Sequence, residues 1–492
     1  MQQFHRDDKS KTTVWQTMIK CCKNFCLQTS IHGFYHIAGP RRHWTERMIW
    51  VGITAVALWG AISVSTGQFQ RYRDNPTVVA LDKDYKSWKF SLPGVTACDE
   101  DRVSKEKLEK AIQSRWNVSP DEEKYEYYAK FVDIVANSNF FHLEGYEEFK
   151  SDPKLNVDLF KLVVEVMPDQ HIVISSSEPI SPTWTPIMTE HGACYVTNSI
   201  AVYDAAIVKP HPNTTKDMPF TCQYSMGLCF IMFVLNSNAH FFVHSPYDIA
   251  DTSNPPSTII PFLNRFTYLT VTETRAGQGV RELSPRRRAC LYTDESSGNM
   301  TVYSTHMCRL GCRSRLAVKL CGCQPFYYFY EGGKPCTPAG MWCLSRYSRD
   351  LANFAGMKCK CSPLCLDSLF RESTTENRVW EKNLFHGAGA IRLTVYSPRL
   401  RYTREIVFHF EDLVVSFGGA AGLFLGASFI SFVEIIYFLL ERFCYTFATT
   451  KSDTIQEYNQ KAIIHYYDKK TLHENRLQEI ALTFKGRKHI KY

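Results

Sequence analysis

One apolar stretch of the chain carries residues that could pass an ion across a membrane. It runs from Leu413 to Leu440 and contains four glycines, the tripeptide Gly426-Ala427-Ser428 and a single carboxylate, Glu434. A plain lipid anchor needs none of these, because ionisable groups inside a membrane are costly and glycine permits close backbone approach or a broken helix. The stretch therefore indicates a pore-lining segment.

The glycines of this stretch also allow a second interpretation. Gly418, Gly422 and Gly426 form a G-x3-G-x3-G row, a pattern that commonly marks a close helix crossing in lipid. Packing and pore lining are compatible, so both hypotheses stay open. Glu434 likewise has an alternative role, a buried ion pair with a basic residue of a neighbouring helix.

Cysteines supply the second chemistry, disulfide cross-linking. The chain has 18 cysteines, and 14 of them lie between the apolar stretches, an even number that suits an oxidising compartment. Cys308 and Cys312 are four residues apart, on one face of a predicted helix, whereas Cys359 and Cys361 are two apart, on one face of a predicted strand. This spacing predicts a helix stapled to a strand. Zinc ligation is the alternative, but the chain has no Cys-x2-Cys pair and we predict no metal site.

Two membrane spans must position these residues. Met48 to Gly67 is twenty residues long, about what a hydrocarbon core of roughly 30 Å requires. The predicted domains are a cytoplasmic N-terminus (1–47), a first span (48–67), an extracellular cysteine-rich domain (68–412), a pore-lining second span (413–440) and a cytoplasmic C-terminus (441–492). A mean hydropathy of -0.24 agrees with a chain that is mostly water-soluble.

Charge and glycosylation signals give the orientation. Arg41, Arg42 and Arg47 precede the first span and Arg442 and Lys451 follow the second, which places both termini of a multi-pass protein in the cytoplasm. Sequons lie only between the spans, as an exported loop requires, at Asn117, Asn213 and Asn299.

The large loop predicts an α+β domain. Helical spacing is present at 100–116, 121–135, 157–167, 303–320 and 340–356, and strand-like composition at 227–236, 240–245, 265–273 and 391–398. The net charge of +8 is modest and does not indicate nucleic acid. No G-x-S-x-G, H-E-x-x-H or Walker motif is present, so we do not expect an enzyme.

Four features in this order resemble the degenerin and epithelial sodium channel family, which includes the acid-sensing channels, and most closely its insect pickpocket branch. They are His32-Gly33 before the first span, FSLPGVTAC ending at Cys98, the ladder of ten cysteines and SFGGAAGLFLGASFISFVE, within a match over about residues 30 to 445. The resemblance implies a chalice-shaped homo- or heterotrimer with sibling subunits, in the plasma membrane. It also implies palm, finger and thumb regions, the thumb over about 290–365, and a sodium-permeable, amiloride-blocked pore that needs no cofactor.

The resemblance also implies disulfide partners. In the thumb they are Cys290 with Cys365, Cys308 with Cys361, Cys312 with Cys359, Cys321 with Cys343, and Cys323 with Cys336. Cys98 is expected to pair with Cys194. Cys222 and Cys229 have no counterpart pair in the acid-sensing members, and we assign them to each other as a local loop closure.

In the pore, the resemblance gives roles to single residues. Gly426-Ala427-Ser428 matches the selectivity filter, and Glu434, nearly two helical turns further on, would form a threefold ring of carboxylates. Gly422 falls at the amiloride position, beside Gly418 and Gly419. Val415 falls at the gate position, where added bulk holds degenerins open, and Ser416 replaces the acidic gate residue of the acid-sensing members.

His32 and Gly33 match the cytoplasmic gating motif, the alternative being a loop histidine and a turn glycine. The stimulus is where the chain departs from its relatives. Ser345 and Arg349 stand where the acid-sensing members have carboxylates, and Arg287 stands in place of a tryptophan. We therefore do not expect proton gating of that kind.

Two other functions stay open. A non-conducting or accessory receptor subunit would not need the tripeptide and Glu434 in one span. An ATP-gated two-span trimeric channel shares the topology, but it would be expected to show clustered ectodomain lysines and it lacks this cysteine ladder.

Overall fold

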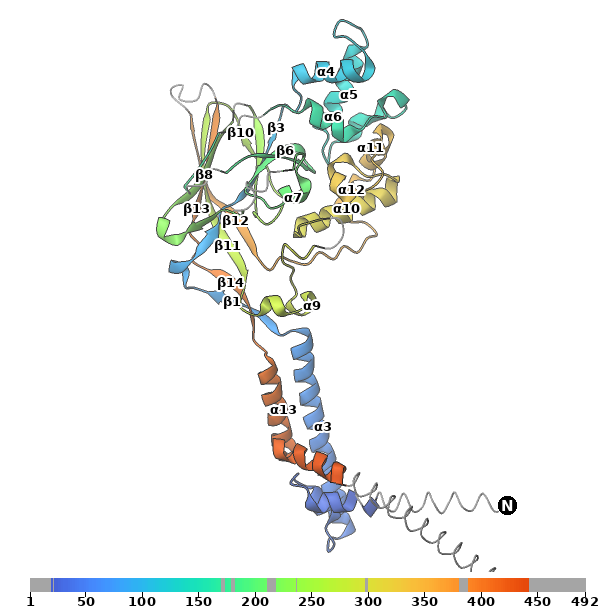
Figure 1. The fold of residues 1–492 in the computed structure, drawn as a ribbon, viewed down its shortest axis with the longest axis vertical. Coiled ribbons are helices and arrows are strands. Elements are labelled where there is room, and N and C mark those ends of the chain that lie inside the picture. Colours follow the sequence, from blue (N-terminus) through green and yellow to red (C-terminus); the bar gives the residue numbers. More distant parts are fainter. Residues whose placement is uncertain are drawn as a thin grey trace, which may run out of the picture. The chain divides into compact units, whose positions relative to one another are not determined.

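A computed structural model describes residues 19–20, 22–169, 173–177, 182–209, 218–235, 237–296, 300–379 and 388–441. The chain forms two compact units, one from residues 1–73 with 408–492 and the other from residues 74–407. Asn213, Asn299, Cys21, Cys444 and the C-terminus after Glu441 lie outside the described residues. Figure 1 shows the helices and strands of both units.

The first unit is helical. Its named helices are α2 (Phe34–Ala38), α3 (Trp44–Asp74) and α13 (Phe410–Leu425). Helix α3 has 31 residues and exceeds the predicted first span at both ends. By length and composition α3 is apolar enough to cross a membrane, whereas α13 passes the same test only together with the helix Phe429–Glu441, from which it is bent by 81°.

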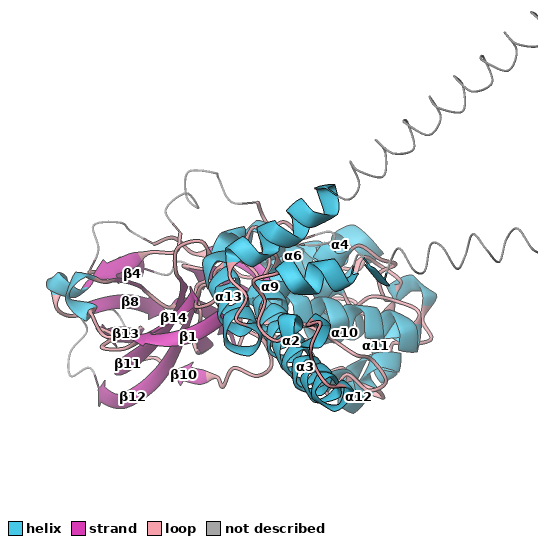
Figure 2. Ribbon diagram, turned by 90° about the horizontal axis from the view of Figure 1, so that it is seen from below, coloured by secondary structure: helices cyan, strands magenta, loops and turns pink. Residues whose placement is uncertain are grey.

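The second unit contains both sheets. Its seven-stranded sheet has the order β1-β14-β11-β13-β8-β4, with β12 paired to β11, and consists of β1 (Thr77–Asp82), β4 (Val173–Ser176), β8 (Cys229–Leu235), β11 (Leu263–Ala276), β12 (Asp367–Val379), β13 (Gly389–Tyr396) and β14 (Arg401–Ile406). Figure 2 shows β4, β8, β13, β11 and β12 side by side in that order. A five-stranded sheet has the order β10-β9-β3-β6-β5, from β3 (Gly94–Asp99), β5 (Thr185–Thr189), β6 (Gly192–Thr197), β9 (Ala239–His244) and β10 (Ser257–Ile259). A two-stranded sheet pairs β2 (Lys89–Ser91) with β7 (Thr221–Gln223).

Helices cover one face of the five-stranded sheet. They are α4 (Lys105–Trp116), α5 (Tyr125–Asn137), α6 (Leu159–Val166), α7 (Val202–Ala205), α10 (Thr305–Cys321), α11 (Pro338–Ser345) and α12 (Ser348–Ala352). The short helix α9 (Pro285–Arg288) lies apart from this group (Figure 1). Helix α6 illustrates why these segments are helical. Its buried residues Leu159, Leu162, Val163 and Val166 follow helical spacing, and the Asp158 carboxylate accepts a hydrogen bond from the Lys161 N–H as an N-cap.

Two cores hold this unit together. One lies between the sheets and is formed by alternate residues of both, such as Phe233, Phe241 and Leu393. The other lies between the helices and the opposite face of the five-stranded sheet, where Phe242 and Ile187 contribute. Successive residues Phe241 and Phe242 enter different cores because strand side chains alternate between faces.

Two predictions about the cysteine-rich region are wrong in detail. The segment around Cys359 and Cys361 is neither helix nor strand, because no partner strand pairs with it and Pro363 lacks an N–H for a ladder. The predicted helix at 340–356 is divided into α11 and α12. The Ser345 hydroxyl donates to the Trp342 carbonyl at 2.7 Å, and this local bond competes with continuation of the helix.

Candidate functional site

The candidate site is the break between α13 and the helix Phe429–Glu441. Helix α13 ends at Leu425, and the predicted filter residues Gly426, Ala427 and Ser428 form the non-helical link. Because the chain turns by 81° here, it cannot continue the hydrogen bonding of one straight helix. The tripeptide is thus a bend with a helix end on each side.

Gly426 closes the first helix end. Its φ is +58°, in the left-handed region that glycine adopts at low cost. The Gly426 N–H donates to the Gly422 carbonyl at 3.0 Å, and the Ala427 N–H donates to the Ala421 carbonyl at 3.2 Å. These bonds satisfy carbonyls that the end of a helix would otherwise leave unpaired.

Ser428 opens the second helix. Its carbonyl accepts from the Phe432 N–H at 3.4 Å, and its own N–H donates to the Ser431 hydroxyl at 3.1 Å. The returning bond from the third helical residue is half of a capping box, with serine in the place of the usual glutamate. Ser431 is buried and was not singled out in the sequence, although Ser428 followed by a serine at the capping-box spacing was a readable signal.

The segment before the first span contacts this break. The His32 N–H donates to the Leu425 carbonyl at 3.0 Å, and the Ser30 and Ser431 hydroxyls are 2.7 Å apart. A Cβ at Gly426 would lie only 2.2 Å from the His32 ring nitrogen Nδ1. The structure therefore brings the predicted gating motif and the predicted filter together.

Gly33 and Glu434 take part in the same arrangement. Gly33 has a φ of +89°, and a Cβ there would lie 2.9 Å from the Thr54 hydroxyl of α3. The Glu434 carboxylate accepts from the Ser30 N–H at 3.2 Å. Within the described residues Glu434 makes no ion pair, so its contact here is with the N-terminal segment.

Helix α13 has one face against α3 and one bare face. Leu413, Ala420 and Ala421 are buried, and a Cβ on Gly60 of α3 would lie 2.7 Å from the Phe424 ring. Close packing of α3 and α13 therefore uses Gly60, which sequence reasoning did not single out.

The predicted pore residues occupy the other face. Val415 is 73% exposed, and a Cβ at Gly418 or Gly419 would meet no atom within 4 Å. At Gly422 the nearest such atom is the Ala427 carbonyl oxygen, 3.8 Å away. Ser416 is partly buried. Gly418 and Gly422 of the glycine row are therefore not used for packing within the described part of this chain and are free to line a pore or to meet another subunit, whereas Gly426 packs against His32.

The N-terminal end of α13 is capped by its own acidic residue. The Asp412 carboxylate accepts from the His409 N–H at 2.8 Å, within a capping box, and Glu411 stays exposed in the first turn. Both negative charges lie at the positive end of the helix dipole and therefore stabilise the helix. Near this end the rings of Tyr72 and Phe408 lie 6.4 Å apart.

The cysteine-rich region is joined by disulfides. The described residues contain the bridges Cys98–Cys194, Cys222–Cys229, Cys290–Cys365, Cys308–Cys361, Cys312–Cys359, Cys321–Cys343 and Cys323–Cys336. These are the partners that the sequence analysis assigned. The sulfurs of Cys308, Cys312, Cys359 and Cys361 lie within 4.8 Å of one another, but paired as disulfides they are not the thiolates that zinc requires.

A charged cluster anchors α10, the helix that carries one cysteine of each of three bridges, Cys308, Cys312 and Cys321. The Asp248 carboxylate accepts from the His306 N–H and from the Ser304 hydroxyl, at the helix N-terminus. The His306 ring nitrogen Nδ1 lies 3.7 Å from Asp248 and 3.9 Å from Asp251. Burial alone would lower the pKa of His306, but the carboxylates of Asp248 and Asp251 outweigh it and raise that pKa above its ordinary value.

The remaining predicted positions lie apart from these clusters. Ser345 is the last residue of α11 and Arg349 lies in α12. Neither side chain is a carboxylate. Asn117 is exposed at the C-terminal end of α4, with a φ of +55°, and is accessible for glycosylation.

Comparison with known proteins adds a family match. Residues 25–438 match the family described as amiloride-sensitive sodium channel. Pickpocket protein 19 of Drosophila melanogaster is 20% identical and the alignment covers 90% of this chain and 94% of that protein. The sodium channel protein Nach of the same species is 22% identical, covering 84% and 86%. The human bile acid-sensitive ion channel is 21% identical, covering 85% and 86%.

Proposed function

The chain belongs to the amiloride-sensitive sodium channel family, and on that premise we propose that it is a subunit of a sodium-permeable, amiloride-sensitive, voltage-independent cation channel gated through its extracellular domain. Members of this family are ion channels of the plasma membrane, not enzymes. We propose further that three copies, or this chain with sibling subunits, surround one pore, with both termini in the cytoplasm.

The observation that carries this proposal is the break at Gly426–Ser428 beside the bare glycine face of α13. In such a channel, oxygens of the Gly426–Ser428 link, including the Ser428 hydroxyl, would replace part of the hydration shell of a cation. With α3 on the opposite face of α13, the side carrying Val415, Gly418 and Gly422 is the one available to line a pore. Amiloride would then contact Gly422, and Val415 would lie at the gate.

Voltage clamp of a cell without background sodium current tests the proposal. We expect an amiloride-sensitive sodium current, and we expect Ser428→Ala to change the sodium-to-potassium permeability ratio. Thr66→Val in α3 is the control, because the Thr66 hydroxyl donates to the Ile62 carbonyl of its own helix.

Two outcomes would contradict the proposal. A current whose permeability ratio is the same in wild type and Ser428→Ala would remove the filter assignment. Surface protein that stays silent under every trigger, alone and with sibling subunits, would instead favour an accessory receptor subunit.

A further inference from the structure

A hollow of about 900 Å³ lies on the seven-stranded sheet. It is lined by η4 (Tyr224–Met226) and the residues after it, the middle of β11, the end of β13 and the β13–β14 connection. Its size is within the range of small-molecule sites. No function in the preceding sections uses it.

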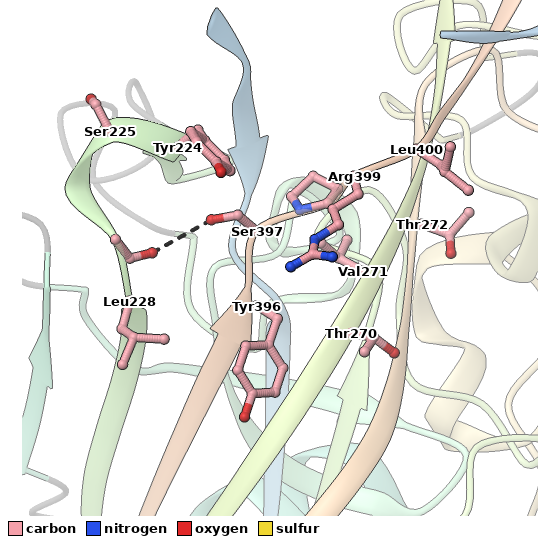
Figure 3. Close-up of a pocket in the computed structure, with 12 residues that line it drawn as sticks. Tyr224, Ser225, Leu228, Thr270, Val271, Thr272, Tyr396, Ser397, Arg399 and Leu400 are labelled. Carbon is pink, nitrogen blue, oxygen red and sulfur yellow. Dashed lines mark hydrogen bonds between the residues drawn. The ribbon is translucent and has the colours of Figure 1, made fainter. Parts of the chain in front are cut away.

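The sheet topology explains why the hollow exists. Strand β13 pairs with β11 up to Tyr396 opposite Thr270, and β14 pairs with β11 only from Arg401 opposite Glu273. Between these two ladders Val271 and Thr272 have no partner on that edge, and the chain from 397 to 400 leaves the sheet. The Ser397 hydroxyl donates to the Gly227 carbonyl at 3.4 Å, which ties this connection to the opposite wall (Figure 3).

Arg399 gives the hollow its charge. Figure 3 shows its guanidinium extending into the space beside Tyr396 and Val271. Among the lining residues it is the only Asp, Glu, Lys, Arg or His. Within the described part of the chain Arg399 has no hydrogen bond or ion pair, whereas the nearby Arg401 donates to the Glu273 carboxylate at 2.6 Å.

The walls around this charge offer aromatic and apolar side chains against which the apolar part of a ligand can pack. Tyr396, which is stacked on Tyr268 at 5.7 Å between ring centroids, provides an aromatic edge, and Leu228 and Leu400 are exposed apolar side chains. Thr272 contributes a hydroxyl. An unpaired guanidinium recognises carboxylates and sulfonates through a planar fork of donors.

We propose that this hollow binds a small organic anion, a carboxylate or sulfonate with a ring-shaped apolar body, through Arg399. The charged end pairs with the guanidinium, and the ring packs against Tyr396 and the apolar wall. The inference does not depend on conduction, and its test measures binding without current.

The test uses the full-length protein purified in detergent and naphthalene-2-sulfonate as the probe, by isothermal titration with empty micelles subtracted. We expect Arg399→Gln to weaken binding by about tenfold or more, as for loss of a charged hydrogen bond. Arg378→Gln is the matched control, because Arg378 is an exposed arginine of β12 paired with Glu376, outside the hollow. Tyr396→Ser should also weaken binding while leaving the charge in place.

The uncharged analogue 2-naphthalenemethanol separates charge from apolar partition. We expect it to bind wild type at least tenfold more weakly than the sulfonate and to bind wild type and Arg399→Gln equally. Equal sulfonate binding by wild type and Arg399→Gln would overturn the proposal. Absence of binding to wild type would also overturn it, and this is the result expected if a carboxylate of a sibling subunit pairs with Arg399.

Discussion

Gly426 shows how one residue type fixes the shape of the break. Its left-handed backbone costs any residue with a Cβ about 1–2 kcal/mol, and the His32 ring occupies the space that a Cβ would need. Both effects act at the point where the N-terminal segment meets the end of α13.

We expect Gly426→Ala to displace His32 or to reshape the end of α13, and so to reduce current per surface-expressed channel several-fold. Surface labelling combined with voltage clamp measures this. Gly52→Ala in α3 is the control, since a Cβ there meets no atom within 4 Å. Equal currents in the two variants would show that the contact between His32 and Gly426 does not affect the current per channel.

His244 is a second residue whose environment makes a measurable prediction. It is buried between the Thr96 hydroxyl and the Ser245 carbonyl, each 2.9 Å from a ring nitrogen. Burial lowers its pKa to about 4, with His306, Asp251 and Asp248 as the other groups acting on it. The neutral ring is therefore the form that the fold accepts.

The pH dependence follows from that depressed pKa. As pH falls below about 6.5 the unfolded chain binds a proton at His244 before the folded chain does, so the free energy of unfolding decreases by roughly 3 kcal/mol between pH 6.5 and 4. We expect thermal unfolding of His244→Gln to show a smaller decrease over this range. Parallel curves for the variant and wild type would contradict the assignment.

His306 is the internal control for the direction in which stability changes with pH. Its pKa is raised, so its contribution to stability is complete below about pH 6.5 and is lost as pH rises through the raised value. We expect His306→Gln to lose more stability in acid than in base.

At the scale of elements, α10 is held to the 357–363 segment by neighbouring rungs. Cys308–Cys361 and Cys312–Cys359 leave from successive turns of one helix and reach residues two apart. With either rung in place, the other closes only a short additional loop. Their contributions to stability should therefore depend on each other.

We expect the double variant Cys312→Ser/Cys359→Ser to lose about 2 kcal/mol of stability, the entropic value for a short loop. Removal of both rungs should cost more than twice the loss from one, because, with Cys290–Cys365 still in place, it also releases a longer loop of about 22 residues. Thermal unfolding of the full chain under non-reducing conditions measures both. Additive losses would mean that the remaining rung does not restrain the segment.

At the scale of the whole molecule, two positions in the unit 74–407 where the acid-sensing relatives are expected to have carboxylates hold other side chains. Ser345 hydrogen-bonds within its own helix, and Arg349 brings a positive charge to α12. In α13, Ser416 likewise has a hydroxyl in place of the expected carboxylate, about one turn after Glu411 and Asp412.

We therefore expect little current from the homomer when external pH is lowered from 7.4 to about 6. Voltage clamp during fast solution exchange measures it, with an amiloride-sensitive baseline as proof of expression. A large proton-evoked current would contradict this prediction and would direct attention to the cluster of His306, Asp248 and Asp251.

Several features of the fold followed from local sequence. The helices at α4, α5, α6 and α10 and the strands β8, β9, β11 and β13 lie where periodicity and composition predicted them, although the ends of the elements moved. The strand predicted around Cys359 failed because spacing within one segment does not provide a partner strand. The helix predicted at 340–356 is divided where the Arg346 and Tyr347 N–H groups donate to carbonyls three residues back, instead of the four residues back of a continuous α-helix.

The sequence by itself determined the two apolar runs, the even set of cysteines between them and the family, because these depend on composition and on local order. Only the tertiary structure decided what meets the break and where the sheet opens. Ser30 and Glu434, whose contact joins the N-terminal segment to the second helix, are 404 residues apart, and the hollow at Arg399 depends on two strands sharing one edge of β11. Contacts across such separations arise from the packing of the folded chain, which no local pattern specifies.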